Sequence, residues 1–482
     1  MRCVVHPISA IGAIVPNFAL NPGLSWQWHW RNQVYEPLGA KTISVLGWIL
    51  GDPTIYTTSM EVARQIVNAR GQLEKSYETT AIMAQWGPNL FSTNGDDWRR
   101  HRRILGAAFN ADVYKFVWKE TASLFDEMVE AEQWKKQPVV ALNPVNKLTT
   151  KFALNIISRC AFGNVFSWQY ESAQPEAMDF GKALEIVAQS CLFRVIIPNW
   201  MYRLPIPLLR RMDAAYKTLG SFMASVLASR KSEMSGNTTE DNQSRHDLFS
   251  FMTSASDDEG HAAMSDDEVI SNTFLMLFAG HDTTAHTLDA AIGLLALYQD
   301  IQQEIYEEIK TVALEDASLP YDAYPKLHKT EACFLESLRL FPAAFLMVRT
   351  TTEDTVITTD DPHIHGGRLP LSKGTMLAVD LIGMHYNAEY FPEPEEFKPS
   401  RWYDARENDL SMFSFGSRTC IGRRFALTEA VCFLSHLLLS WRVEPIMRDG
   451  ETAAQWRKRL MVADVSMTLG VKSLPIRLVA RV

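Results

Sequence analysis

The sequence lacks the excess of positive charge that marks a general nucleic-acid-binding protein. Its 47 lysine and arginine residues stand against 56 aspartate and glutamate residues, which gives a formal net charge of -9. A nucleic-acid-binding protein would carry a basic surface instead. The charge balance therefore excludes that class, and by itself it indicates no other partner.

Cysteine is scarce, and its spacing fits no common framework. The chain has six cysteines in 482 residues, and none lie in a Cys-x-x-Cys pair. Paired spacing of that kind is typical of zinc sites, and dense regular spacing is typical of disulfide-bonded secreted domains. We therefore expect no zinc site, no disulfide framework and a reducing compartment.

Long apolar runs and linkers are also missing. Val4 to Val15 is mostly apolar, but it contains His6, Pro7 and Gly12 and falls short of the ~20 apolar residues that span a bilayer. No Pro/Gly/Ser-rich linker separates two self-contained patterns. Hydrophobic content of 47% and charged content of 21% are ordinary for a globular chain. The sequence predicts an ordered domain without a convincing transmembrane helix.

Two kinds of regular structure are expected. Short apolar runs at residues 43–50 and 54–58, on either side of Gly51, predict two strands of a small sheet. From Glu61 onward apolar residues recur mainly at helical spacing. Ser265 and Glu268 form a capping-box pattern that opens a helix expected to reach Leu297, roughly 50 Å at about 1.5 Å per residue.

One cysteine has unusual neighbours. Phe413-Ser-Phe-Gly-Ser-Arg-Thr-Cys-Ile-Gly422 places Cys420 between two glycines and directly before a long apolar helix. A thiolate is stabilised by backbone N–H donors and by a helix N-terminus, and the glycines permit that close approach. The pattern predicts a haem-iron thiolate ligand, which favours O–O cleavage. The alternative is a buried free cysteine acting as a small hydrophobe.

Polar residues interrupt the predicted long helix. Ala279-Gly-His-Asp-Thr-Thr284 sets an acid and two hydroxyls in an otherwise apolar stretch. Gly280 weakens the helix and Thr283 can return a hydrogen bond to the preceding turn, so we expect an opened helical ladder and a groove for dioxygen. The alternative is that these groups merely find partners in the core.

The arrangement Phe-x-x-Gly-x-Arg-x-Cys-x-Gly matches every fixed position of the cytochrome P-450 signature, and the chain resembles that superfamily from about Trp26 to the C-terminus. The resemblance implies a mainly α fold with a small β-rich lobe (α+β). It implies one haem-thiolate monooxygenase domain, residues 26–482, after an N-terminal segment, residues 1–25. The cofactor would be haem b, with the Cys420 thiolate as the axial metal ligand.

The same resemblance implies roles for individual residues. Thr283 would hydrogen-bond the oxygen being activated, and Asp282 would relay protons to it, as a general acid does. Glu336 and Arg339 would join Arg401 in a buried structural triad that holds the cysteine loop. Cofactor contacts would come from Trp98, Arg102, Arg349, Phe413, Gly416, Arg418, Cys420 and Gly422, and substrate contacts from Trp86, Phe274, Phe278, Ala279, Ala343, Ala344, Phe345, Leu346 and Val465.

The expected partner is an electron donor. The chain has no strand-linked Gly-x-Gly-x-x-Gly pattern, so electrons would come from a separate NADPH-dependent flavoprotein reductase. Further arginines would lie near the proximal face. They either steer an acidic partner or form a solvated charged surface; they are Arg99, Arg100, Arg103, Arg423 and Arg424.

The resemblance also bears on location and substrate. Eukaryotic members usually carry a membrane anchor, so either this protein holds the membrane by other means or the sequence begins late. Leu192 to Leu209, broken by prolines, fits a membrane interface and ordinary core packing equally well. We expect a monomer on the cytosolic face of the endoplasmic reticulum.

The apolar residues expected in the pocket favour terpenoid, steroid or polyketide-like substrates. The segments Trp26-Gln-Trp-His-Trp30 and Ala279-Gly-His-Asp-Thr-Thr284 look like the corresponding segments of fungal family members that act in secondary metabolism. Alternatives are a reductase-independent peroxygenase or isomerase, and a non-catalytic haem-binding protein.

Overall fold

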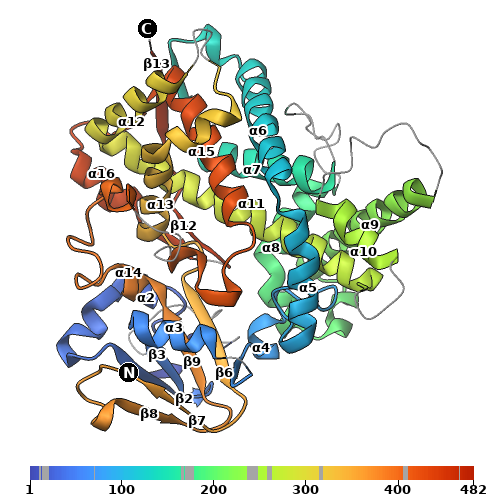
Figure 1. Ribbon diagram of the computed structural model, residues 1–482, viewed down its shortest axis with the longest axis vertical. Coiled ribbons are helices and arrows are strands. Elements are labelled where there is room, and N and C mark those ends of the chain that lie inside the picture. Colours follow the sequence, from blue (N-terminus) through green and yellow to red (C-terminus); the bar gives the residue numbers. More distant parts are fainter. Residues whose placement is uncertain are drawn as a thin grey trace.

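The computed structural model describes residues 1–9, 12, 21–69, 71–163, 168, 178–235, 248–257, 263–313, 318–404, 411–465 and 467–481. Much of the N-terminal segment 1–25 therefore lies outside the described residues. Figure 1 shows a strand-rich lobe that holds the N-terminus at the bottom and a larger helical part above it. The predicted class, mainly α with a small β-rich lobe, is confirmed.

The strand-rich lobe is built on a six-stranded sheet in the order β1-β2-β3-β9-β6-β4. The two strands predicted around Gly51 form an antiparallel pair in which Thr42 lies opposite Thr57. At the edge, Arg2 lies opposite Leu46, so the start of the N-terminal segment belongs to this sheet. The strands are β1 (Arg2–Val5), β2 (Thr42–Leu50), β3 (Thr54–Thr57), β9 (Met376–Asp380), β6 (Leu346–Thr351) and β4 (Leu73–Glu74).

Three smaller sheets complete the strands that the structure describes. One has the order β10-β13-β5, and the other two are the antiparallel pairs β11-β12 and β7-β8. Their bounds are β5 (Val139–Leu142), β7 (Thr355–Thr358), β8 (Arg368–Leu371), β10 (Trp441–Pro445), β11 (Ala463–Val465), β12 (Leu469–Val471) and β13 (Ile476–Ala480).

The helical part holds the main hydrophobic core. Its helices, with those of the smaller lobe, are α2 (Trp26–Trp30), α3 (Met60–Asn68), α4 (Tyr77–Thr80), α5 (Gly95–Ala108), α6 (Ala111–Ala131), α7 (Asn146–Phe162), α8 (Phe180–Ile196), α9 (Pro207–Ser235), α10 (Leu248–Asp257), α11 (Asp266–Leu297), α12 (Gln299–Val312), α13 (His328–Leu340), α14 (Leu381–His385), α15 (Arg423–Ser440) and α16 (Ala453–Leu460).

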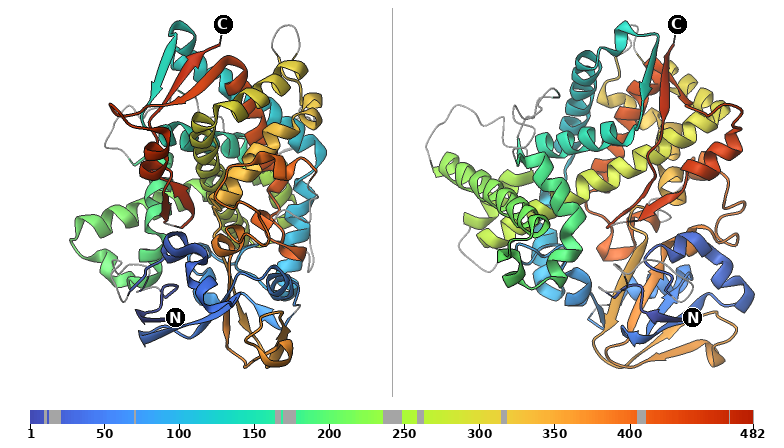
Figure 2. Two further views of the ribbon diagram at one scale, coloured as in Figure 1. Left: turned by 90° about the vertical axis from the view of Figure 1, so that its left-hand side faces the viewer. Right: turned by 180° about the vertical axis from the view of Figure 1, so that it is seen from behind.

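The long helix α11 crosses the middle of the helical part, as the view from behind in Figure 2 shows. It starts at the predicted capping box, in which Ser265 and Glu268 bond each other's backbone N–H groups, and it ends at Leu297. Residues 271–278 are buried on every side. Among the described residues no helix is both long and apolar enough to cross a membrane.

Candidate active site

A cavity of about 420 Å³ lies where α11, α5, β6 and the segment before α15 meet. It is lined mostly by apolar side chains, with a cationic cluster at one side. Of the predicted site residues, the structure places ten in its wall together with Ala343 and Leu346: Trp98, Arg102, Ala279, Thr283, Ala344, Arg349, Phe413, Arg418, Cys420 and Gly422.

The segment around Cys420 is a tight, hydrogen-bonded loop. The Cys420 N–H donates to the Phe413 carbonyl at 2.8 Å, which closes the loop onto itself. Gly416 has a φ of 60°, and a Cβ at this position would overlap the Asn68 side chain. Only glycine therefore fits the turn that presents Cys420 to the cavity. Gly416 itself does not line the cavity.

The Cys420 side chain is exposed, and it is exposed to the cavity; the other five cysteines are buried elsewhere. Burial among protein atoms raises the pKa of the Cys420 thiol. The backbone N–H groups of Gly422 and Arg423 and the charge of Arg102 act in the opposite direction. Because Gly422 caps the N-terminus of α15, these donors are placed to hold a thiolate.

Three cations gather at one side of the cavity. Burial lowers the pKa of Arg349 to about 10 and, with the nearby Arg349 charge, that of Arg418 to about 10. Burial and the charges of both arginines hold the pKa of Lys75 well below its usual value. Arg418 lies over the Trp98 ring at 4.2 Å, and its buried Nη1 has no hydrogen-bond partner among the residues that the structure describes. The cluster is suited to a ligand that carries carboxylates.

Lys75 is a cavity residue that the sequence did not indicate. It lies near β4, far along the chain from the cysteine segment, and no motif surrounds it. Its Nζ donates to the Phe91 carbonyl at 2.9 Å and lies 3.4 Å from the centre of the Phe91 ring. Only the folded arrangement shows that this amine joins the two arginines.

The predicted triad comes together at the end of α13. Both oxygens of the fully buried Glu336 carboxylate accept from Arg339, at 2.8 and 2.9 Å. Arg401 Nε donates to Glu336 Oε1 at 3.2 Å, and Trp402, which the sequence did not single out, donates to Oε2 at 2.8 Å. Arg339 also bonds the His385 carbonyl, so the group joins α13 to α14 and to residues 399–402.

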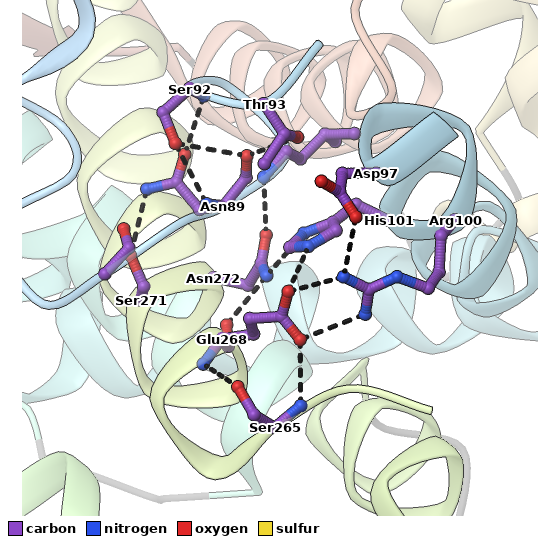
Figure 3. A network of polar contacts seen from close by, with 12 residues as sticks. Asn89, Ser92, Thr93, Asp97, Arg100, His101, Ser265, Glu268, Ser271 and Asn272 are labelled. Carbon is purple, nitrogen blue, oxygen red and sulfur yellow. Dashed lines mark hydrogen bonds and ion pairs between the residues drawn. The ribbon is translucent and has the colours of Figure 1, made fainter. Parts of the chain in front are cut away.

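Arg100 does not belong to a free basic surface, which corrects the grouping made from sequence. Figure 3 shows its guanidinium on the Glu268 carboxylate, with N–O distances of 2.5 and 3.0 Å. His101 also bonds Glu268, at 3.1 Å, and Asn272 links His101 to the backbone N–H of Leu90. Burial favours the protonated form of Glu268, but the hydrogen bonds from Arg100, Ser265 and His101 outweigh it and hold the pKa at about 2. The network fixes α5 to the start of α11.

Several predicted substrate residues lie behind the cavity wall rather than in it. Trp86 stacks on Tyr216, with ring centres 5.4 Å apart, and lies tilted against Phe274 at 4.6 Å. Phe274 also contacts Phe278. The side of α11 that faces the cavity carries Leu275 and Met276 instead. The predicted substrate residues that do not line the cavity are Trp86, Phe274, Phe278, Phe345 and Val465. Asp282, predicted as a proton relay, does not line it either.

The expected opening of α11 is not seen. The helix is continuous through Gly280 and Thr283, and the Thr283 hydroxyl donates to the Ala279 carbonyl at 2.7 Å. Gly280 has a different role: a Cβ there would lie 2.8 Å from the Ile157 side chain, so glycine lets α7 approach α11 closely. Thr283 nevertheless presents its side chain to the cavity.

Comparison with known proteins decides the family. The family model described as Cytochrome P450 matches residues 22–467. Cytochrome P450 monooxygenase 124 of Postia placenta is 34% identical over 467 residues, which cover 95% of this chain and 89% of that protein. This chain belongs to the cytochrome P450 family.

Other P450 proteins also resemble this chain in sequence and in fold. Cyclooctat-9-en-7-ol 5-monooxygenase of Streptomyces melanosporofaciens is 28% identical over 393 residues, which cover 80% of this chain and 79% of that protein. A solved cytochrome P450DA haem domain superposes with a TM-score of 0.77 at 20% identity and covers 100% of this chain, which shows the shared fold. The chain is thus an oxygen-incorporating oxidoreductase of the P450 monooxygenase type.

P450 proteins hold haem b through a cysteine thiolate, and the residues present fit that group. Cys420 faces the cavity, a Cβ at Gly422 would meet no atom within 4 Å, and the orphan Arg418 Nη1 fits a propionate. When bound, haem supplies the electron transfer to dioxygen that breaks the O–O bond. The chain's own part is to hold the thiolate by N–H groups, bind the carboxylates, exclude water with apolar walls and place the Thr283 side chain in the cavity.

Proposed function

We propose that the protein inserts one atom of dioxygen into a terpenoid-like substrate in fungal secondary metabolism, with electrons from a separate NADPH-dependent flavoprotein reductase. The observation that carries the proposal is the apolar part of the cavity wall. It includes Leu275, Met276 and Ala279 of α11, together with Ala343 and Ala344. Such a wall selects substrates by shape and apolar area rather than by charge.

Two comparisons support the proposal, the first on the fungal setting and the second on the substrate class. The Postia placenta relative is a fungal P450 monooxygenase. The Streptomyces relative acts, by its name, on cyclooctat-9-en-7-ol, an unsaturated cyclic alcohol. A mostly hydrocarbon ring skeleton of this kind suits the observed wall, and the hydroxyls of Thr283, Thr284 and Thr287 offer a few polar contacts to it.

The test is a spectral titration of the haem-loaded protein with cyclic terpene alcohols, steroids and fatty acids. The proposal predicts saturable Soret shifts with the cyclic terpene alcohols, and a monohydroxylated product when NADPH and a purified reductase are added. A panel in which only fatty acids shift the band would contradict the substrate class. Product formed with hydrogen peroxide but never with the reductase would contradict the electron route.

We further propose that the protein contacts the cytosolic face of the endoplasmic reticulum through the segment between α8 and α9 together with the first turn of α9. Trp200 and Leu208 there are 62% and 67% exposed, and Ile206 is 40% exposed. Arg203 and Arg210 are exposed beside them. Exposed apolar side chains flanked by arginine are typical of a surface that lies in an anionic lipid interface.

Flotation with vesicles that contain phosphatidylserine tests this contact. The proposal predicts that a Trp200→Ser, Leu208→Ser double variant floats several-fold less than the unmodified protein. Met447→Ser is the control, because Met447 is 40% exposed in the loop before α16. Equal flotation of the double variant and the unmodified protein would contradict the proposal.

A further inference from the structure

The carboxylate of Asp282 does not lie in the cavity wall but contacts Thr468, the residue directly before β12. It accepts a hydrogen bond from the Thr468 hydroxyl, which lies 186 residues further along the chain. Thr468 is only 6% exposed. Thr283, the next residue of α11, lines the cavity, whereas Asp282 does not. The acid is therefore held on the outer side of α11 by a hydroxyl from a different element.

The same hydroxyl contacts a histidine. His286 Nδ1 lies 3.0 Å from Thr468 Oγ1, and His286 stands one helical turn beyond Asp282 on α11. Because the hydroxyl donates its single proton to Asp282, it accepts from His286, which places a proton on Nδ1. The three side chains then form one directed chain, from the imidazole through the hydroxyl to the carboxylate.

The backbone around this chain is shaped to hold the imidazole. β12 packs along α11, as Figure 1 shows. A Cβ at Gly470 would lie 2.7 Å from His286 Cγ and 3.0 Å from its Nδ1. Only a residue without a side chain leaves room for the ring between α11 and β12. The ring is thereby confined beside Thr468.

The neighbouring ionisable groups do not compete for these contacts. His281 Nδ1 bonds the Leu277 carbonyl at 2.7 Å. Cys191 of α8 and Asp289 of α11 feel the charge of Asp282, but the Asp289 carboxylate is bonded to Thr149 and Asn146 of α7. Among the described residues His286 Nε2 has no protein partner, and the side chain is half-buried. Solvent can therefore reach it.

We propose that His286 and Thr468 are the outer part of the proton supply to Asp282, a step that rests on the proposed dioxygen chemistry. His286 Nδ1 gives its proton to Thr468 Oγ1 while the hydroxyl gives its own proton to the Asp282 carboxylate. Water gives a proton to His286 Nε2, so the imidazole stays neutral and changes tautomer. One proton thus moves from solvent to Asp282, with no change in electron count. His286 and Thr468 position and supply the acid and do not touch substrate.

The first test does not depend on activity. Protein labelled with ¹⁵N at histidine, in the diamagnetic carbon monoxide complex of the reduced form, reports which ring nitrogen carries the proton. His286→Gln identifies the signal among the twelve histidines. The proposal predicts a proton on Nδ1 of His286, lost in Thr468→Val and kept in Thr468→Ser. A proton on Nε2 alone in the unmodified protein would overturn it.

The second test measures dioxygen consumption driven by NADPH and purified reductase, in H₂O and in D₂O, without added substrate. Thr468→Val should slow consumption several-fold and raise the H₂O/D₂O rate ratio, and Thr468→Ser should restore both. Thr273→Val is the matched control, because the hydroxyl of this buried threonine of α11 donates to the Val269 carbonyl within its own helix. An unchanged isotope ratio in Thr468→Val, even with lower thermal stability, would mean a structural role and would overturn the proposal.

Failure of the underlying function looks different. If the unmodified protein shows the haem-thiolate spectrum yet consumes no dioxygen with the reductase, the proposed function fails. The histidine spectrum then still decides whether Thr468 holds His286 as proposed.

Discussion

At the residue scale, what could be predicted depended on how local the chemistry is. The environment of Cys420 lies within one continuous segment, so Gly416, Gly422 and the start of α15 indicated a thiolate site before any fold was known. Lys75 could not be found in this way. Lys75 lies far from Arg418 in the sequence, and only folding of the chain brings the two side chains close together.

Gly416 gives a first prediction at this scale. Gly416→Ala should cost about 1–2 kcal/mol for the left-handed backbone and about 1–3 kcal/mol more for the overlap with Asn68. Thermal unfolding and haem content measure the effect. Gly450→Ala is the control, because Gly450 also has a positive φ but a Cβ there would meet no atom within 4 Å. Equal losses in both variants would contradict the crowded turn.

Lys75 gives a second prediction at the residue scale. If its amine helps to hold the cofactor's carboxylates, Lys75→Met should weaken haem binding about 10-fold or more, since hydrogen bonds to charged groups contribute ~1.5–3 kcal/mol. Titration of the haem-free protein with haemin measures the affinity. The exposed Lys373 serves as control in the same substitution. Unchanged affinity in Lys75→Met would remove Lys75 from the site.

At the scale of elements, the bounds of α11 could be predicted and its orientation could not. The capping box at Ser265 and Glu268 marks the start of the helix by local hydrogen bonding. Residues 271–278 are all buried, so the sequence pattern has no distinct hydrophobic face there that would predict which side of α11 lines the cavity. The resemblance implied Phe274 and Phe278 as wall residues, whereas Leu275 and Met276 lie there.

Asp289 joins α11 to α7 and gives a prediction about pH. Burial raises the pKa of this carboxyl to about 8, against the hydrogen bonds from Thr149 and Asn146. The folded state thus keeps a proton that the unfolded chain loses near pH 4, so this group's contribution to stability is full below pH 4 and falls as pH rises toward 8, by at most about 1.4 kcal/mol per pH unit. Asp289→Asn should remove this slope.

Denaturant unfolding of the haem-loaded protein at several pH values between 4 and 8 measures that slope. Asp267→Asn, at an exposed acid in the first turn of the same helix, is the control. The same loss of stability with pH in Asp289→Asn and in the unmodified protein would show that Asp289 does not carry it.

At the scale of the whole molecule, the resemblance predicted the two-lobed fold, but it did not predict which arginines stay exposed at the surface. Arg100 forms an ion pair with Glu268, because the N-terminal cap of α11 lies against α5. Arg103 is exposed, and Arg99 is 64% exposed although it forms an ion pair with the exposed Asp96. The docking surface that the proposed acidic reductase would use therefore includes Arg99 and Arg103 and not Arg100.

Charge reversal tests this surface. Arg99→Glu with Arg103→Glu should slow reduction by the reductase several-fold at low salt and by less at high salt, because screening removes the steering. Arg368→Glu, an exposed change of the same sign on β8 of the strand-rich lobe, is the control. Reduction rates that do not depend on salt in any of these proteins would leave the docking role without support.

The central claim is that Cys420 holds haem iron as a thiolate in the cavity beneath α11. The most direct measurement is the difference spectrum of the purified, dithionite-reduced protein with carbon monoxide, beside Cys420→Ala and beside Cys160→Ala, which alters a buried cysteine outside the cavity wall. The account predicts a strongly red-shifted Soret band that is kept in Cys160→Ala and lost in Cys420→Ala. An unshifted band, or a shifted band that survives in Cys420→Ala, would contradict it.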